Sequence, residues 1–411
     1  MTFLPFFPEC LEPMNASRLI ALYLPLALGS LSLAQTPSLV TPPQAPALAA
    51  MKIPPPPAVP TTAYVLIDYD TGRVLAAEKA DERMEPASIT KLMTGYIVFS
   101  AVREKRLRLD EEIVISEHAW RAGGAASGGS TTFLKVGSTV PADVLIKGMI
   151  IQSGNDATIA LAERLGGTES AFVELMNQYA ARLGLKNTHF DNSWGDHSPN
   201  HYSTAHDLAL LGQALIRDFP EDYKIYSMRE FVWNGIKQQN RNGLLARDPS
   251  VDGIKTGHTE AAKYCLVSSA KRNGQRLIAT VLGSPKIKDR EDASAALLNY
   301  GFTFYENVKL QAGNQTILKP RVFKGAEDFV PVGTARDSFA TVQRGQGGMI
   351  QKNAEVKGRL IAPIKKGMTV GELTVKSGNQ VVARIPLITL ADMPEAGFFG
   401  RLADTVRLWF N

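Results

Sequence analysis

The alternation of apolar and polar positions predicts a two-stranded hairpin where the ordered part of the chain begins. Residues 63–69 and 73–77 alternate in this way, and the Asp-Thr-Gly sequence between them is typical of a hairpin turn. Two more strand-like runs occupy residues 264–270 and 276–282. Helical patterns start at Pro86 and recur at residues 141–151, 157–165, 169–183, 204–216 and 290–304. Strands at both ends with helices between them indicate an α+β domain, one antiparallel sheet covered by a helical cluster, over residues 61–306.

The pattern changes after Glu306 to short strand-like runs separated by Gly, Asn and Lys. These runs lie at residues 316–322, 338–343, 355–360, 371–375 and 380–389. Such spacing predicts a small all-β domain over residues 307–392, and this region contains no cluster of catalytic residue types.

Residues 393–411 predict an amphipathic helix. At 100° per residue, one face carries Phe398, Phe399, Leu402, Val406, Trp409 and Phe410, and arginines lie on the rest. The helix is too short to span a bilayer but suits the interface of an anionic membrane. The alternative is a helix whose apolar face packs on the β domain.

The N-terminus has the pattern of a secretory signal peptide over residues 1–34, with translation starting at Met1 or Met14. Arg18 precedes an apolar run at residues 19–33, and Ser32-Leu33-Ala34 ends in small residues suited to cleavage. We expect an exported protein, the alternatives being a later cut after Ala49 or an uncleaved anchor. Residues 35–60 are rich in Pro and Ala and predict an extended linker.

Composition excludes several classes of protein. With 45% hydrophobic and 21% charged residues, the chain has the composition of a globular protein. Its net charge is +5, but the sequence contains no run of basic residues interleaved with aromatic ones. Nucleic acid is therefore not an expected partner. Of the two cysteines, Cys10 lies in the predicted leader, so no disulfide is expected, and Cys265 should be a small buried residue.

The pair Ser88 and Lys91 is the first candidate for chemistry. Three residues apart on a helix, they share one face, and a hydroxyl with an amine in reach is a possible nucleophile. The chain has its own control, because Ser268 and Lys271 show the same spacing within a predicted strand. There the two side chains point to opposite faces and cannot cooperate.

Two further motifs follow in chain order, Ser153-Gly154-Asn155 and Lys255-Thr256-Gly257. Sets of this kind occur in class A β-lactamases and penicillin-binding proteins. Taken singly, Ser153 and Asn155 also fit a helix-ending turn, and Lys255 a solvated lysine. A second Ser-Gly-Asn sequence, at residues 377–379, is more simply a hairpin turn of the β domain.

Over residues 63–410 the chain resembles the low-molecular-mass D-alanyl-D-alanine carboxypeptidases of the penicillin-binding protein 5 type. Five segments carry the resemblance, at residues 86–94, 152–157, 184–190, 240–245 and 251–259, and a Gly-Phe-Phe-Gly sequence at 397–400 also matches. The resemblance implies a penicillin-recognising serine transpeptidase/β-lactamase-like domain, a β domain acting as a stalk, and a terminal helix on the outer face of the cytoplasmic membrane. It implies removal of the terminal D-alanine from peptidoglycan stem peptides ending in D-Ala-D-Ala, and covalent binding of β-lactams.

The residues of the three motifs then have expected roles. Ser88 attacks the amide carbonyl with neutral Lys91 as base, since burial and the charge of Lys255 lower the pKa of Lys91. By analogy with the family, Ser153 passes a proton to the leaving nitrogen and Asn155 orients the lysine and the substrate.

Substrate binding is assigned to the third motif. Lys255 and Thr256 would hold the terminal carboxylate, and Gly257 would let the peptide lie close to the strand edge. The backbone N–H groups of Ser88 and His258 are the expected oxyanion hole.

A histidine-rich stretch around His197 and His201 does not predict a metal site. Pro199 breaks any helix that would align the two rings, and no supporting cysteine or Glu motif follows. We expect a loop near the site, and neither a metal nor a cofactor.

Three other functions remain open at this point. A β-lactamase of class A needs a glutamate-held water, but residues 182–220 contain no Glu. A transpeptidase usually belongs to a longer chain with a spanning helix. A non-catalytic cell-wall scaffold would have no need of the intact motifs.

Overall fold

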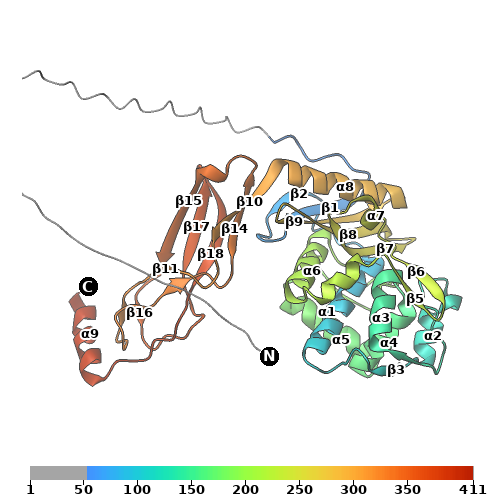
Figure 1. Cartoon of the computed structure of the whole chain (residues 1–411), viewed down its shortest axis with the longest axis horizontal. Coiled ribbons are helices and arrows are strands. Elements are labelled where there is room, and N and C mark those ends of the chain that lie inside the picture. Colours follow the sequence, from blue (N-terminus) through green and yellow to red (C-terminus); the bar gives the residue numbers. More distant parts are fainter. Residues whose placement is uncertain (1–52, 411) are drawn as a thin grey trace, which may run out of the picture. The chain divides into compact units, whose positions relative to one another are not determined.

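The computed structural model describes residues 53–410 (Figure 1), and it leaves the side chains of residues 409 and 410 undescribed. The predicted signal peptide and the linker up to residue 52 lie outside the described residues. The described end of the linker lies against the folded chain. Ile53 and Val59 pack on a hydrophobic cluster, and the Pro54 carbonyl accepts a hydrogen bond from the Tyr300 hydroxyl at 3.1 Å.

A five-stranded sheet organises the first domain, in the order β2-β1-β9-β8-β7. Its strands are β1 (Ala63–Asp68), β2 (Val74–Glu78), β7 (Val251–Thr259), β8 (Lys263–Arg272) and β9 (Gln275–Ser284). All neighbouring pairs are antiparallel, and β1 pairs with β9 although some 200 residues separate them, as in Leu66 opposite Ala279. The predicted hairpin and the predicted antiparallel sheet are both confirmed.

Both faces of this sheet are buried, which explains why its strands are apolar almost throughout. Along β1, Val65 and Ile67 belong to one core, whereas Tyr64 and Leu66 belong to another. The first core packs against a helical cluster and the second against α8 (Ile287–Phe304), so the two lie on opposite faces, as the side-chain alternation of a strand requires (Figure 1).

The helical cluster agrees with the sequence pattern in most of its helices. It comprises α1 (Lys91–Arg103), α2 (Glu117–Gly123), α3 (Ala142–Lys147), α4 (Asn155–Gly166), α5 (Glu169–Arg182) and α6 (Ala205–Asp218). Two details differ. Pro86 precedes a 3₁₀ turn, η1 (Ala87–Thr90), before α1 begins, and the helix predicted to run through residue 151 changes at Gly148 into a π-helix, η3 (Gly148–Gln152).

Short elements complete this domain. They are the pair β3 (Glu112–Val114) and β4 (Thr139–Pro141), the hairpin β5 (Glu230–Trp233) and β6 (Ile236–Gln239), the 3₁₀ turns η2 (Ala125–Ser127) and η4 (Asp222–Ser227), and α7 (Leu244–Arg247). The β5–β6 hairpin was not expected. Its signal was the Asn234-Gly235 dipeptide, whose positive φ angles of 48° and 74° are those of a two-residue hairpin turn.

The second domain is all β, as predicted. Its main sheet has the order β11-β13-β18-β17-β15, formed by β11 (Thr316–Leu318), β13 (Val332–Gly333), β15 (Ile350–Val356), β17 (Thr369–Ser377) and β18 (Gln380–Thr389). Two small sheets pair β10 (Tyr305–Gln311) with β14 (Ser338–Gln343) and β12 (Val322–Phe323) with β16 (Leu360–Ile361), and η5 (Gly347–Met349) precedes β15. The strands predicted at residues 316–322 and 355–360 are wrong in their bounds, since the first is divided between β11 and β12 of different sheets. Ser377-Gly378-Asn379 does join β17 to β18 as a turn.

The chain continues into the C-terminal helix α9 (Phe398–Phe410). Asp404 ties this helix to the β domain, because its carboxylate accepts a hydrogen bond from the backbone N–H of Lys324 at 2.6 Å. The apolar side chains point elsewhere: Phe398 is 67% exposed, Phe399 83%, Leu402 54% and Val406 51%. The β domain therefore leaves these four side chains at least half uncovered, although Phe398 and Leu402 line a small pocket together with Lys324. No helix among residues 53–410 is long and apolar enough to cross a bilayer.

Two buried tyrosines of η4 differ in the hydrogen bonding of their hydroxyl groups, so together they test what such a bond contributes to stability. Their rings stack at 5.5 Å, but the Tyr223 hydroxyl donates to Asp252 at 3.0 Å, whereas the Tyr226 hydroxyl has no partner among the described residues. We expect Tyr226→Phe to leave the free energy of unfolding unchanged or raise it, since a buried unpaired hydroxyl is unfavourable. Tyr223→Phe should lower it by about 1 kcal/mol, because it removes one hydrogen bond to the Asp252 carboxylate, which Arg276 still pairs. Urea unfolding of both variants measures the difference, and equal effects would contradict this interpretation.

Candidate active site

Ser88 lies in the 3₁₀ turn η1, which packs against the edge strand β7. The contact is close, because a Cβ added to Gly257 of β7 would lie 2.8 Å from the Pro86 carbonyl oxygen. A larger residue at position 257 would therefore push the turn away from the strand. The glycine of the third motif thus sets the distance between the strand and the serine.

Lys91, at the start of α1, is 1% exposed, and its nitrogen lies within hydrogen-bond distance of three oxygens. These are Ser88 Oγ at 2.9 Å, Asn155 Oδ1 at 2.8 Å and the Trp194 carbonyl oxygen at 2.7 Å. The predicted pairing of Ser88 with Lys91 is therefore present, and the second motif contributes Asn155 to it.

The surroundings of Lys91 favour the neutral amine. Burial is the main cause that holds the pKa of Lys91 well below its usual value, and the positive charge of Lys255 lowers it further. Asp156 acts in the opposite direction but does not outweigh these two effects.

Ser153 and Lys255 form a second serine–lysine pair. Ser153 follows the π-helix in the left-handed conformation, at φ 67°, and its Oγ accepts a hydrogen bond from Lys255 Nζ at 2.9 Å. Both side chains are 2% exposed. Burial, with the charges of Arg241 and Arg290, lowers the pKa of Lys255 to about 7.

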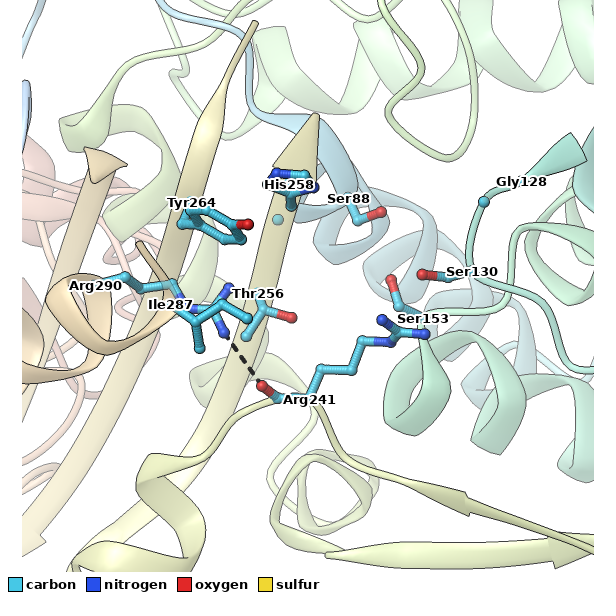
Figure 2. Close-up of a pocket in the computed structure, with 12 residues that line it drawn as sticks. Ser88, Gly128, Ser130, Ser153, Arg241, Thr256, His258, Tyr264, Ile287 and Arg290 are labelled. Carbon is cyan, nitrogen blue, oxygen red and sulfur yellow. Dashed lines mark hydrogen bonds between the residues drawn. The ribbon is translucent and has the colours of Figure 1, made fainter. Parts of the chain in front are cut away.

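A cavity of about 590 Å³ opens beside these residues, and five of the eight predicted site residues line it. In Figure 2, Ser88, Ser130 and Ser153 stand on one side, Thr256 and His258 follow β7, and Tyr264, Ile287 and Arg290 lie on the other side. Gly257 lines it as well, whereas Lys91, Asn155 and Lys255 are buried and reach it through Ser88 and Ser153.

Two arginines of this cavity were missed as functional residues. Arg241 lies in a segment that carries the family resemblance but had no assigned role, and its Nε donates to the Gln152 carbonyl at 3.1 Å. Arg290 of α8 is 4% exposed, donates to the Arg241 carbonyl at 3.4 Å and lies over the Tyr264 ring (Figure 2). Two guanidinium groups beside Lys255 make the cavity suitable for an anion.

The histidine-rich stretch is a loop, as predicted, and one of its histidines contacts the turn that carries Ser88. His201 is buried, shares a hydrogen bond of 2.7 Å with the Thr90 hydroxyl, and has its pKa lowered to about 4 by burial. His197 instead pairs with Glu85 at 2.7 Å. Within residues 53–410, no group of three or more His, Cys, Asp or Glu side chains is arranged to hold a metal ion.

Both domains of this chain match known protein families. Residues 50–286 match the family model of D-alanyl-D-alanine carboxypeptidases, and residues 305–395 match that of the penicillin-binding protein 5 C-terminal domain. The D-alanyl-D-alanine carboxypeptidase DacA of Escherichia coli is 42% identical over 363 residues, which cover 87% of this chain and 90% of that protein. DacC of the same species is 42% identical over 86% of this chain and 90% of its own length.

Solved structures of penicillin-binding proteins also match this chain. Penicillin-binding protein 5 from Haemophilus influenzae matches with a TM-score of 0.77 at 40% identity, covering 83% of this chain and 99% of that one. Penicillin-binding protein 6B from Escherichia coli matches with a TM-score of 0.68 at 35% identity, covering 82% and 98%. The matches extend over the catalytic cavity and the β domain alike.

Proposed function

Since this chain belongs to the D-alanyl-D-alanine carboxypeptidase family, we propose that Ser88 is the nucleophile of its acyl-enzyme. The protein is a serine-type D-alanyl-D-alanine carboxypeptidase, a hydrolase. Its substrates are peptidoglycan stem peptides ending in D-Ala-D-Ala, and β-lactams acylate the same serine. The hydrogen bond of 2.9 Å between Lys91 Nζ and Ser88 Oγ carries this proposal.

The base is neutral Lys91. A neutral amine has two N–H groups and one lone pair, and two of its three partners, Asn155 Oδ1 and the Trp194 carbonyl, can only accept. When both N–H groups bond to these oxygens, the lone pair faces the Ser88 hydroxyl. Lys91 then takes the hydroxyl proton as Ser88 Oγ bonds to the peptide carbonyl carbon.

Ser153 supplies the proton that the departing D-alanine nitrogen needs when the carbon–nitrogen bond breaks. Its hydroxyl accepts from Lys255, so its own hydrogen is free to point into the cavity that it lines. Lys255, in its charged form, replaces the proton that Ser153 gives up. When water then hydrolyses the ester, the proton of the attacking water returns through Ser153 to Lys255, and the proton held by Lys91 returns to Ser88 Oγ.

The substrate carboxylate is held on the β7 side of the cavity. Thr256 and Arg241 line this part of the cavity, and Lys255 and Arg290 add positive charge beside it. Gly257 leaves room for the peptide along β7, and the backbone N–H groups of Ser88 and His258 form the oxyanion hole.

The rival enzymatic functions are less well supported. No glutamate lines the cavity in the described part of the chain, which leaves a β-lactamase without its usual water-activating group. A DD-transpeptidase from Streptomyces matches with a TM-score of 0.56 at 30% identity, but it covers only 60% of this chain. The acceptor of the acyl group, water or an amine, separates transpeptidase from carboxypeptidase.

The first test is mass spectrometry of the purified protein with a penicillin, together with D-alanine release from a D-Ala-D-Ala peptide. We expect a long-lived adduct on Ser88 and released D-alanine, and Ser88→Ala should lose the adduct and about a thousandfold or more of the activity. The matched control is Ser268→Ala, which alters the serine of the other Ser-x-x-Lys sequence and should retain both.

Three outcomes would contradict this function. An adduct that disappears within seconds would indicate a β-lactamase, and transfer of the peptide to an added amine in place of water would indicate a transpeptidase. Folded protein with neither adduct nor D-alanine release would indicate a scaffold.

The pH dependence of acylation tests Lys91 as the base. The rate should rise with pH as Lys91 loses its proton, at a pH well below the ordinary lysine pKa. Lys255→Met removes a positive charge that lowers the pKa of Lys91, so that pKa rises and the acid limb of kcat/KM moves to higher pH. Lys271→Met, at an exposed lysine, is the control. A limb that stays in place or moves to lower pH in Lys255→Met would refute the assignment.

We also propose that the protein is exported and lies on the outer face of the cytoplasmic membrane, bound through α9. The exposed apolar side chains of this helix support the proposal, because they would leave water on entering the bilayer interface. The predicted signal peptide, outside the described residues, is its second basis.

Binding to vesicles containing anionic lipid tests the membrane proposal. The double change Phe398→Asp and Phe399→Asp should weaken binding by about tenfold or more, since each buried phenylalanine contributes about 1.5–3 kcal/mol. The control is Phe329→Asp, because Phe329 is 52% exposed but lies outside the helix. Activity on a soluble peptide should not change. Equal binding by the helix variant and the wild type would rule out anchoring through these residues.

A further inference from the structure

The carbonyl that binds the catalytic lysine belongs to a tight turn at residues 192–196, which we call the carbonyl turn. Asn192 Oδ1 closes this turn by accepting hydrogen bonds from the backbone N–H groups of Trp194, Gly195 and Asp196, at 3.3, 2.7 and 2.9 Å. Gly195 has a φ of +96°, and a Cβ added to it would lie 1.9 Å from the Ala87 carbonyl oxygen. The turn is therefore pressed against the segment that carries Ser88.

Glu169, the first residue of α5, fixes the carbonyl turn from the side away from the cavity. Its Oε1 accepts two hydrogen bonds from Ser193, one from the backbone N–H at 3.0 Å and one from the hydroxyl at 2.6 Å. From α1, the Thr94 hydroxyl donates to the Ser193 carbonyl at 2.5 Å. Ser193 is fully buried and directly precedes Trp194, so two helices hold the residue next to the carbonyl that Lys91 uses.

We propose that Glu169 is a positioning residue for acylation, which holds the Trp194 carbonyl at the nitrogen of Lys91 through Ser193. This inference rests on the proposed role of Lys91 as the base. Glu169 is not among the described residues that line the cavity, so its effect on substrate comes through the carbonyl turn alone.

The position of this carbonyl decides where the lone pair of Lys91 points. With Asn155 and Trp194 each taking one N–H, the lone pair is left for the Ser88 hydroxyl. If the carbonyl moves away, the amine rotates and donates an N–H to Ser88 Oγ, an arrangement that cannot remove the hydroxyl proton. The rate of acylation should then fall, while noncovalent binding of the substrate should stay the same.

Two substitutions separate positioning from mere packing. Glu169→Ala removes the acceptor of both Ser193 hydrogen bonds, whereas Glu169→Gln retains an oxygen that can accept them. His118→Ala is the matched control. His118 Nε2 hydrogen-bonds only to the other oxygen of Glu169, at 2.7 Å, so its removal leaves the two Ser193 hydrogen bonds in place.

The experiment is stopped-flow acylation by benzylpenicillin, with a titration of the fraction of Ser88 that becomes labelled. In Glu169→Ala we expect the acylation rate constant to fall by about tenfold, the effect of losing one or two hydrogen bonds to a charged group. The dissociation constant of the noncovalent complex and the labelled fraction should equal those of the wild type. Glu169→Gln should restore most of the rate, and His118→Ala should match the wild type.

A lower labelled fraction at an unchanged rate constant would show that Glu169 only supports folding, and it would overturn the inference. A wild-type rate in Glu169→Ala would do the same. Lys91→Ala, measured alongside, distinguishes the two proposals. If it acylates at the wild-type rate, the base assignment fails, whereas an inactive Lys91→Ala beside a fast Glu169→Ala refutes only the role of Glu169.

Discussion

The three hydrogen bonds of the buried Lys91 nitrogen are the interaction on which the site depends. A lysine nitrogen removed from water is stable only when it finds hydrogen-bond partners, and here the partners come from η1, from the start of α4 and from the carbonyl turn. Asn155 lies 64 residues from Lys91 in sequence, and Trp194 lies 103 residues away. The surroundings of the proposed base are therefore assembled only when the helical cluster is fully packed, which would link catalytic competence to the folding of this domain.

A second constraint is the presence of two buried lysines around one cavity. Each lysine is bonded to its own serine, Lys91 to Ser88 and Lys255 to Ser153, and each contact measures 2.9 Å. Burial lowers both pKa values, and the charge of Lys255 adds to the effect on Lys91. In the proposed mechanism the two amines have different tasks: the first is kept neutral to accept a proton, and the second lies near the arginines, where a substrate carboxylate would favour its charged form.

The sequence predicted the parts of the site that depend on residue type and local spacing. The helical spacing of Ser88 and Lys91 and the order of the three motifs led to residues that the structure brings together at one cavity. The parts that were missed depend on tertiary contacts. The Trp194 carbonyl is backbone, which no residue type marks, and Arg290 reaches the cavity only because α8 packs across the sheet. Likewise, the π-helix that places Ser153 in its left-handed conformation leaves no signal in a pattern that reads as a continuous helix.

The second Ser-x-x-Lys sequence shows why spacing acquires a meaning only through secondary structure. Ser268 and Lys271 have the same separation as Ser88 and Lys91, but they lie in β8, opposite Ala279 and Arg276 of β9. Ser268 is buried and donates to the Ala279 carbonyl at 3.2 Å, whereas Lys271 is exposed on the other face. In the strand the hydroxyl donates to a backbone carbonyl, and the amine remains in water. Ser88 and Lys91, which we propose as nucleophile and base, lie where a 3₁₀ turn leads into a helix and the cluster around them excludes water.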